Sequence, residues 1–322
     1  MQLGIIGSGK IVRDFLTALP LPGLKLAAIA TTRRSAATGQ ELADQYGISR
    51  VYDDYLEMLK DDQVDTVYVA TPSSMHYQMC LDSLAAGKNV ICEKPFVFTT
   101  EEALELKQLA DQKGCLITEA ITNRYLPAFK SLASDLQLLG PVHVVSLNYT
   151  QYSSRYDRFL AGDIAPAFNP RLGGGGALLD LNVYNIHLAI SLFGAPLDVH
   201  YFPNLQKGVD TSGVLVLAYD DKQASLTAAK DSQAFAHNPS LIAGEKGAIS
   251  FIGSPGDIRS YRLETADGQT AKNFDPDLHR MIPEFTEFIR IFDQKDKTAA
   301  DQAFAHSLQV IAVLEAARDC MP

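Results

Sequence analysis

The sequence is poor in cysteine and lacks long apolar runs. Its four cysteines, Cys80, Cys92, Cys115 and Cys320, form no Cys-x-x-Cys pair and have no histidine at metal-ligand spacing, so we expect neither a disulfide framework nor a bound metal. No apolar stretch approaches the roughly 20 residues of a membrane-spanning helix, and Met1 leads directly into an apolar segment without a basic leader. The sequence therefore predicts a cytoplasmic protein without a membrane partner.

Basic residues are also in deficit. Lys and Arg number 28 against 38 Asp and Glu, which gives a net charge of -10. Because an acidic chain is repelled by nucleic-acid phosphates and by anionic membranes, neither is expected as a partner. The 322 residues, 47% of them hydrophobic, are enough for two domains that each bury a core.

Residues 1–121 alternate short β-rich runs with amphipathic segments of helical length, which predicts a doubly wound parallel sheet in an α/β Rossmann domain. The expected strands are Gln2–Gly7, Leu24–Thr31, Thr66–Ala70, Asn89–Cys92 and Cys115–Thr118, and the expected helices are Lys10–Leu19, Ser35–Tyr46, Asp53–Lys60, Ser74–Ala86 and Thr99–Gln112.

Residues 122–322 change pattern, because strands follow one another without intervening helices. This predicts an α+β domain with an open, mostly antiparallel sheet. The expected elements are a helix at Leu126–Leu138, strands at Val142–Tyr152, Leu197–Pro203, Gly213–Tyr219, Gln223–Lys230, Ser240–Gly244, Ala248–Ile252 and Ile258–Leu263, and closing helices at Leu278–Asp293 and Ala299–Arg318. Since so few helices cannot cover both sheet faces, we expect a homodimer or a higher homo-oligomer.

A glycine motif follows the first strand and leads into a helix. Its members are Gly7, Ser8, Gly9, Lys10 and Ile11. In a dinucleotide fingerprint the first glycine permits the turn, the second lets the backbone approach a pyrophosphate, and the helix N-terminus supplies N–H donors. The motif departs from the usual form at Val12, where a third small residue is expected, and a turn that needs glycine only for its backbone angle is the alternative.

The end of the second strand carries no acidic residue. Thr32, Arg33 and Arg34 stand where an NAD site usually places an acid on the ribose hydroxyls. Arginines suit a 2′-phosphate, so the sequence predicts a preference for NADP(H), with NAD(H) still accepted because neutral neighbours do not exclude it. A solvated helix start is the alternative.

Two further motifs follow later strands, at the edge where doubly wound sheets bind ligands. The first contains Thr71, Pro72 and His76, and the second contains Glu93 and Lys94. A lysine directly after a buried strand, followed by proline, is expected to point toward the ligand crevice, although a surface lysine at a turn is the alternative. A histidine at the start of a helix is by itself more often a surface residue than a catalyst.

The motifs together resemble the Gfo/Idh/MocA oxidoreductase family over nearly the whole chain. They are residues 7–12, 71–76, 86–95, 119–120, 123–125 and 173–180. The resemblance implies a nicotinamide cofactor, and Lys94 matches the family lysine that touches the nicotinamide ribose and the reacting oxygen. Many relatives carry Asp-x-x-x-His on a second-domain helix, whereas here Asp180 is followed by Tyr184, with His187 one turn later. Tyrosine at this place resembles the branch with dimeric dihydrodiol dehydrogenase and xylose dehydrogenase, and it argues against an inositol dehydrogenase.

These residues predict hydride transfer between the nicotinamide and a carbinol carbon of a sugar, polyol or vicinal diol. Tyr184 is expected to be the acid/base, Lys94 the cation that favours its phenolate form and stabilises the oxyanion, and Asp180 the residue that orients them. Asp180, Tyr184 and His187 fall at i, i+4 and i+7 and so should share one helix face. A tyrosine with a satisfied hydroxyl is the alternative for Tyr184, and a core histidine is the preferred interpretation of His187.

Other residues are predicted around the substrate. They are Arg124, which is also assigned to the cofactor, Tyr125, Tyr152, Phe168, Arg171 and His187. A non-catalytic NAD(P)-binding regulator of the same fold is the alternative function, and the joint presence of Lys94, Asp180 and Tyr184 favours the enzyme.

Overall fold

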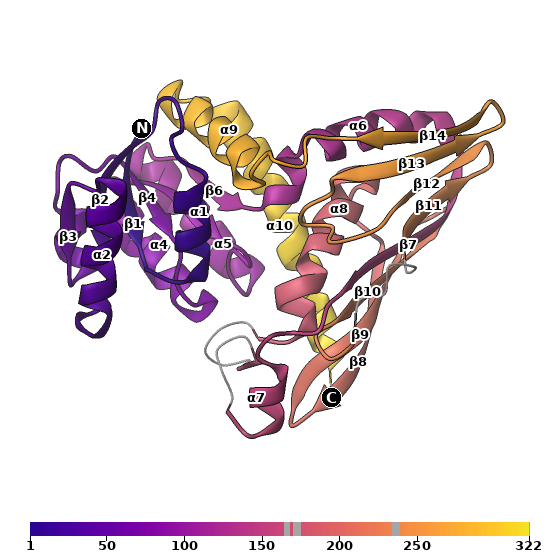
Figure 1. Cartoon of the computed structure of the whole chain (residues 1–322), viewed down its shortest axis with the longest axis horizontal. Helices are drawn as coiled ribbons and strands as arrows, with labels where there is room; N and C mark the ends of the chain where they lie inside the picture. Colours follow the sequence, from indigo (N-terminus) through magenta and orange to yellow (C-terminus); the bar gives the residue numbers. More distant parts are fainter. Residues whose placement is uncertain (164–167, 170–174, 234–238, 322) are drawn as a thin grey trace. The chain divides into compact units, whose positions relative to one another are not determined.

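The computed structural model describes residues 1–163, 168–169, 175–233 and 239–321 (Figure 1). The chain divides into unit 1, which comprises Met1–Ala120 and Met281–Leu308, and unit 2, which comprises Ile121–Arg280 and Gln309–Pro322. The sequence analysis placed both closing helices in the second domain. The structure instead places α9 (Met281–Asp293) and the first half of α10 (Lys297–Asp319) in unit 1.

Unit 1 is built on a six-stranded sheet in the order β3-β2-β1-β4-β5-β6. Every strand pair in it is parallel, which is the arrangement of a dinucleotide-binding Rossmann sheet and confirms the predicted fold class. The strands are β1 (Gln2–Ile6), β2 (Lys25–Ala30), β3 (Arg50–Tyr52), β4 (Thr66–Val69), β5 (Asn89–Glu93) and β6 (Ile117–Ala120). The sequence analysis missed β3, because three residues are too few to show a strand pattern.

Capping residues in the sequence set the ends of some helices of unit 1. The clearest case is α5 (Thr100–Lys113), where the Thr99 hydroxyl accepts from the backbone N–H of Glu102 and Gly114 closes the helix in the left-handed conformation. The others are α1 (Lys10–Thr17), α2 (Ala36–Tyr46), α3 (Tyr55–Leu59) and α4 (His76–Ala85).

An aromatic cluster explains why α9 belongs to unit 1. The ring of Phe285 lies 4.1 Å from that of Phe15 and 5.2 Å from that of Tyr68, measured between centroids. All three side chains are fully buried. Burial of this much apolar surface outweighs the closeness of α9 to unit 2 in the sequence.

Unit 2 is built on an eight-stranded sheet in the order β14-β13-β12-β11-β7-β10-β9-β8. Only the β10–β7 pair is parallel among these strand pairs, so the predicted open, mostly antiparallel sheet is confirmed. The strands are β7 (Val142–Thr150), β8 (Asp198–Gln206), β9 (Val209–Ala218), β10 (Gln223–Ala229), β11 (Ser240–Gly244), β12 (Gly247–Phe251), β13 (Ser260–Thr265) and β14 (Gly268–Asn273). Strand β14 was not expected, because its residues are almost all exposed and polar.

The two faces of this sheet have different environments. Helices α6 (Pro127–Asp135) and α8 (Val183–Phe193) contact the sheet (Figure 1), and Leu215 and Leu217 of β9 are fully buried. The strand register places Val144, Phe202 and Val214 on the opposite face. There Phe202 is 63% exposed and Val144 is 49% exposed, so this face is partly apolar and accessible.

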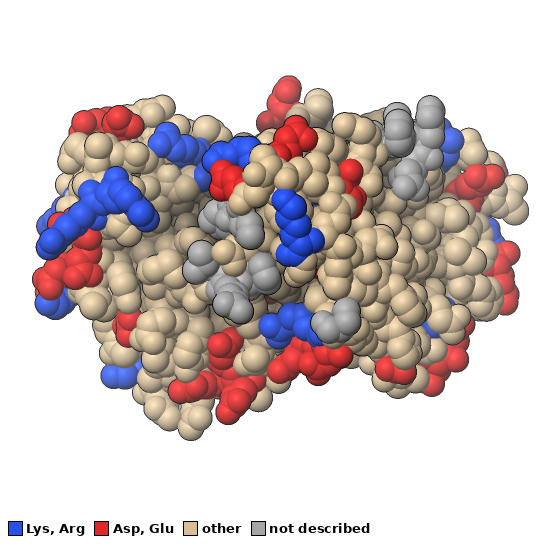
Figure 2. All heavy atoms as spheres, turned by 90° about the horizontal axis from the view of Figure 1, so that it is seen from below, with Lys and Arg blue, Asp and Glu red and all other residues tan. Residues whose placement is uncertain are grey.

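Among the described residues, no helix is long and apolar enough to span a membrane, and no group of three or more His, Cys, Asp or Glu side chains is placed to hold a metal ion. All four cysteines are free thiols, and only Cys320 is exposed. On the face drawn in Figure 2, acidic and basic side chains are interspersed and large areas carry neither.

Candidate active site

A cavity of about 600 Å³ opens in unit 1 at the carboxyl ends of β1, β2 and β4. This is the edge, beside the point where the strand order reverses, at which sheets of this order bind ligands. The lining residues are Ile6, Gly7, Ser8, Gly9, Ala30, Thr31, Thr32, Arg33, Ser35, Asp53, Asp54, Tyr55, Ala70, Thr71, Pro72, Met75 and Met79.

Glycine has a different structural role at each of the two positions of the first motif. Gly7 has a φ of 119°, and a Cβ there would lie 2.4 Å from the carbonyl oxygen of Ala70, so the turn itself requires it. Gly9 caps α1 with a φ of -73°, and a Cβ there would meet nothing within 4 Å. The first turn of α1 has no acidic residue and no side-chain cap. Backbone geometry therefore leaves open space beside free N–H donors, as an anionic ligand requires.

The segment after β2 is ordered by a small hydroxyl network. The Thr32 and Ser35 hydroxyls lie 3.0 Å apart and form a capping box around the short helix Arg33–Ser35. Arg33 lines the cavity with a 92% exposed side chain, and its Nε lies 3.4 Å from a carboxylate oxygen of Asp53. The exposed Arg34 does not line the cavity, and neither do Lys10 and Ile11 of the glycine motif.

Asp53 is a residue of this cavity that the sequence analysis missed. It follows β3 directly, so overlooking that strand also hid the acid at its carboxyl end. The signal was the Asp53-Asp54 pair after the short apolar run of Val51 and Tyr52. An acid therefore lies at this part of the cavity, although it comes from β3 rather than from β2.

His76 is a buried link between the loops that follow β4 and β5. Its Nε2 lies 2.9 Å from the carbonyl oxygen of Thr71 and its Nδ1 lies 3.0 Å from that of Pro95. Burial lowers the pKa of His76, against the opposing effect of these backbone hydrogen bonds. The ring does not line the cavity, whereas Thr71 and Pro72 do, so we infer that His76 positions the loop and does not itself contact a ligand there.

Lys94 follows β5 directly and is half-buried. The buried Glu93 carboxylate beside it accepts from the Tyr68 hydroxyl and, at 3.3 Å, from the Lys94 backbone N–H. The carboxylate of Glu119 accepts from the backbone N–H of Phe96 at 3.1 Å. Two buried carboxylates thus hold the loop that carries Lys94, and neither Glu119 nor Tyr68 was given this role from the sequence.

In unit 2, Asp180 is paired with a lysine that the sequence analysis did not single out. Lys230 Nζ lies 2.8 Å from a carboxylate oxygen of Asp180. The Lys230 side chain is only 1% exposed, against 37% for Asp180, and its ammonium lies 4.5 Å from the ring centroid of Phe168. A charge-assisted contact at this distance fixes the orientation of the carboxylate. The available signal was a lysine directly after Ala228 and Ala229, at the end of the predicted strand Gln223–Lys230.

Asp180 lies in a π-helical turn, Leu178–Asn182, that precedes α8. Such turns widen the helix locally and often occur at functional sites. Asp180 and Tyr184 are partly exposed, whereas His187 is completely buried. The three side chains therefore differ in exposure, and the structure assigns His187 to the core, as its preferred interpretation predicted.

The Tyr184 ring is held by close backbone and aromatic packing. It packs edge-to-face on Tyr149, with 5.6 Å between ring centroids. A Cβ at Gly256 would lie 2.8 Å from Tyr184 Cε1, so only glycine fits there without displacing the ring. The Gly256 carbonyl accepts from the Thr122 hydroxyl at 2.8 Å, and the Tyr184 carbonyl accepts from the Asn123 amide at 2.9 Å.

The remaining substrate candidates differ in accessibility. Tyr152 is exposed and its hydroxyl donates to Asp157, Arg124 is half-buried, and Tyr125 is 9% exposed. Phe168 has no exposed surface and stacks on Phe159, with 4.7 Å between ring centroids. In the described structure Phe168 and His187 therefore offer no surface to a substrate. Arg171, Gly173 and Gly174 lie outside the described residues.

Comparison with protein-family models decides the family. Residues 1–121 match the oxidoreductase family with an NAD-binding Rossmann fold, GFO_IDH_MocA, and residues 135–250 match the GFO/IDH/MocA C-terminal domain. The chain belongs to the Gfo/Idh/MocA oxidoreductase family. This confirms the resemblance drawn from the motifs. The chain is therefore an NAD(P)-dependent oxidoreductase.

Individual relatives extend this result. The Gfo/Idh/MocA chain is 34% identical to scyllo-inositol 2-dehydrogenase (NADP(+)) IolU of Bacillus subtilis, over 100% of this chain and 97% of that protein. It is 32% identical to trans-1,2-dihydrobenzene-1,2-diol dehydrogenase of Sus scrofa, over 78% of this chain and 74% of that protein. Its fold matches that of KijD10, a 3-ketoreductase from Actinomadura kijaniata, with a TM-score of 0.84, 23% identity, and coverage of 99% of this chain and 97% of that one.

Proposed function

We propose that this protein transfers a hydride between NADP(H) and a carbinol carbon of a sugar, polyol or vicinal diol. The observation that carries the proposal is the cavity at the carboxyl edge of the unit 1 sheet, where Gly9 leaves space beside free helix N–H donors and Arg33 adds a cation. When bound, the nicotinamide supplies or accepts the hydride.

The cofactor preference rests on Arg33 and on the absence of an acid directly after β2. Arg33 would contact a 2′-phosphate, while the first turn of α1 would hold the pyrophosphate. Asp53 partly opposes this arrangement, because its carboxylate faces the same guanidinium. NAD(H) therefore stays an accepted second cofactor. The relative IolU is named for NADP(+), which supports the same preference.

The substrate class follows from the relatives together with the site. An inositol dehydrogenase was judged unfavourable from Tyr184, yet a relative that covers the whole chain is a scyllo-inositol 2-dehydrogenase. This relationship supports a cyclic polyol as a substrate despite the expectation drawn from Tyr184. We propose scyllo-inositol and vicinal diols as the first substrates to test, ahead of aldoses.

The chain's own residues move the proton. We propose that Tyr184 exchanges a proton with the substrate oxygen, since its partly exposed phenol belongs to a ring held in place by Gly256 and Tyr149. Lys94 is proposed to stabilise the negative charge that develops on that oxygen. Asp180 orients the site, and its ion pair with the buried Lys230 holds its carboxylate in place.

A pair of matched variants tests the acid/base assignment. Tyr184→Phe removes the hydroxyl but keeps the ring, and Tyr149→Phe makes the same change on the neighbouring ring. We expect turnover to fall about 10²-fold or more in the first variant and to stay within about threefold in the second, with NADPH binding retained in both. Near-normal turnover of Tyr184→Phe on every active substrate would contradict the assignment.

We also propose that the protein is a homo-oligomer, at least a dimer. The support is the accessible face of the unit 2 sheet that carries Val144, Phe202 and Val214, since a partly apolar open face is typical of an interface. Light scattering should give a mass of two or more chains. A monomer at high micromolar concentration would contradict this proposal.

A further inference from the structure

A second cavity, of about 580 Å³, lies in unit 1 at the amino-terminal edge of its sheet. Asp65, Asn89 and Leu116 mark this edge, because they precede or begin β4, β5 and β6. It is therefore opposite to the edge that forms the cofactor cavity. The other lining residues are Val64, Gly87, Lys88, Asp111, Lys113, Gly114, Cys115, Phe292, Lys295 and Lys297.

The charged lining of this cavity is mainly basic. It contains four lysines and two aspartates, so it contributes two net positive charges in a chain whose net charge is -10. Three apolar residues, Val64, Cys115 and Phe292, also line the cavity and are largely buried. A ligand that fits this lining has an anionic group and an apolar part.

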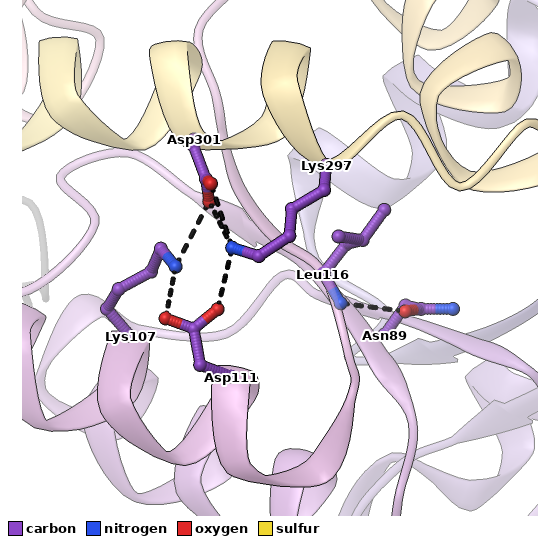
Figure 3. Close-up of polar contacts among 6 residues, drawn as sticks. All are labelled: Asn89, Lys107, Asp111, Leu116, Lys297 and Asp301. Atoms are coloured by element: carbon purple, nitrogen blue, oxygen red, sulfur yellow. Dashed lines mark hydrogen bonds and ion pairs between the residues drawn. The ribbon is translucent and has the colours of Figure 1, made fainter.

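The Asp111 carboxylate is already committed to ion pairs. Its oxygens lie 2.5 Å from Lys107 Nζ and 2.8 Å from Lys297 Nζ. Asp301 completes the cluster at 3.0 Å from Lys107 and 2.8 Å from Lys297. Figure 3 shows these two lysines and two carboxylates facing one another, with Asn89 accepting from the backbone N–H of Leu116 at the neighbouring strand starts. The two lysines and two carboxylates of this cluster sum to zero charge, so the cluster does not balance the positive charge of the other lysines in the lining.

The remaining lysines face no carboxylate. The buried Lys88 ammonium donates to the carbonyl oxygens of Asp61 and Val64, at 2.9 and 2.7 Å. In the part of the chain that the structure describes, none of Lys88, Lys113 and Lys295 lies within ion-pair distance of an acidic group. The second aspartate, Asp65, accepts from neutral donors instead. The cavity thus has uncompensated positive charge.

The backbone at Lys295 distinguishes it from an ordinary surface lysine. Its φ is 51°, in the left-handed region that disfavours a side chain. The ends of α4 and α5 in the same cavity use Gly87 and Gly114 for this conformation, with φ values of 75° and 67°. Glycine would therefore be easier to accommodate after α9 as well. A side chain kept in a strained conformation beside a cavity indicates that the side chain is used.

We propose that this cavity is a second ligand site, which binds the phosphomonoester of a small organic molecule. Lys113 and Lys295 bind the phosphate, Lys88 adds its charge from below, and the organic part lies on Val64 and Phe292. Phosphate is favoured over carboxylate because the described lining carries two net positive charges, which match a phosphomonoester dianion better than a carboxylate with a single negative charge. Lysine ammonium groups bind a phosphate dianion as point charges.

Calorimetric titration with phenyl phosphate tests the proposal, with NADPH saturating so that the cofactor cavity is filled. The wild-type protein should bind one equivalent, and benzoate should bind at least tenfold more weakly. The double variant Lys113→Ala/Lys295→Ala should lose at least tenfold in affinity for phenyl phosphate. The control Lys60→Ala/Lys130→Ala, which removes two exposed lysines elsewhere, should bind like the wild type. No saturable binding, equal affinity for benzoate, or equal losses in both double variants would overturn the proposal.

Lys295→Gly separates ligand binding from a structural role. Glycine suits the left-handed backbone, so the Tm of this variant should equal or exceed that of the wild type while its affinity for phenyl phosphate falls several-fold. If Lys295 and Lys113 serve only to neutralise the negative ends of α9 and α5, the result is the reverse. Lys295→Gly and Lys113→Ala would then lower the Tm and leave the affinity unchanged, and the proposal would be wrong.

Discussion

Replacing Arg33 with alanine should convert an NADP(H)-preferring protein into one that binds both cofactors about equally. A charge-assisted hydrogen bond is worth roughly 1.5–3 kcal/mol, but the Arg33 side chain is 92% exposed, so solvent screening places the contact at the lower end. The 3.4 Å ion pair with Asp53 must also be weakened, and both partners are exposed, which costs about 0–1 kcal/mol. The net is about 0.5–2 kcal/mol, or roughly 2- to 30-fold in affinity for NADPH.

Arg34→Ala is the matched control for this prediction. It removes the same charge from the adjacent residue, which is also exposed but does not line the cavity. Fluorescence titration of NADPH and NADH into the wild type and both variants measures the effect. We expect Arg33→Ala to weaken NADPH binding and to leave NADH binding nearly unchanged, whereas Arg34→Ala changes both affinities less than about threefold.

Asp53→Asn should change the affinity for NADPH in the opposite direction to Arg33→Ala. This substitution removes the carboxylate that opposes a 2′-phosphate and frees the guanidinium, so NADPH binding should strengthen by a few-fold. The reasoning is refuted if Arg33→Ala weakens both cofactors equally, because the side chain would then contact only the adenine, or if Arg34→Ala loses as much as Arg33→Ala. A wild-type preference for NADH would refute the NADP(H) assignment itself.

Three other variants test the catalytic roles by steady-state kinetics and thermal unfolding. Lys94→Ala should lower turnover at least about 10²-fold while the Kd for NADPH changes much less, and unchanged turnover would remove Lys94 from the mechanism. Gly256→Ala places a methyl group against the Tyr184 ring, so turnover should fall about tenfold or more at nearly constant substrate affinity, and an unaffected rate would show that the ring position is unimportant. Lys230→Met keeps the buried volume but removes the Asp180 ion pair. Removing one partner of a buried ion pair is destabilising because it leaves the other charge unpaired, but the Asp180 side chain is 37% exposed, which limits this cost. We therefore expect a loss of at least about tenfold in turnover with a moderate fall in Tm, and the role would be purely structural if only the Tm changed.

Local patterns in the sequence were sufficient to predict the parts of the fold that depend on residues close together in the chain. The turn at Gly7 and the strands β1, β4 and β5 were predictable because continuous apolar runs followed by glycine or polar motifs indicate buried parallel strands. The three-residue strand β3 carries too little pattern, and with it the acid Asp53 at the cavity went unseen. Position in the chain also misled the assignment of α9, whose place depends on the packing of Phe285 against Phe15, residues far apart in the sequence.

In the candidate site too, residues in local motifs were predictable from the sequence, whereas their contacts with distant residues were not. The motif residues Lys94, Asp180 and Tyr184 were identifiable from their order in the chain and from the family resemblance. The partner of Asp180, Lys230, lies fifty positions away, and no local pattern links them. The buried state of Phe168 likewise depends on tertiary packing that periodicity alone does not reveal, whereas the position of His187 in an apolar helix was enough to predict its burial.

The most direct test of the account is nicotinamide absorbance at 340 nm, followed while the wild-type protein is incubated with NADP+ and, separately, scyllo-inositol, a trans vicinal diol and a panel of aldoses. The account predicts an increase in absorbance with at least one of these compounds, faster with NADP+ than with NAD+, and its loss in Tyr184→Phe. No increase with any of them, in a protein that still binds NADPH, and no decrease when the corresponding ketones and aldehydes are offered with NADPH, would contradict hydride transfer and indicate a cofactor-binding regulator instead.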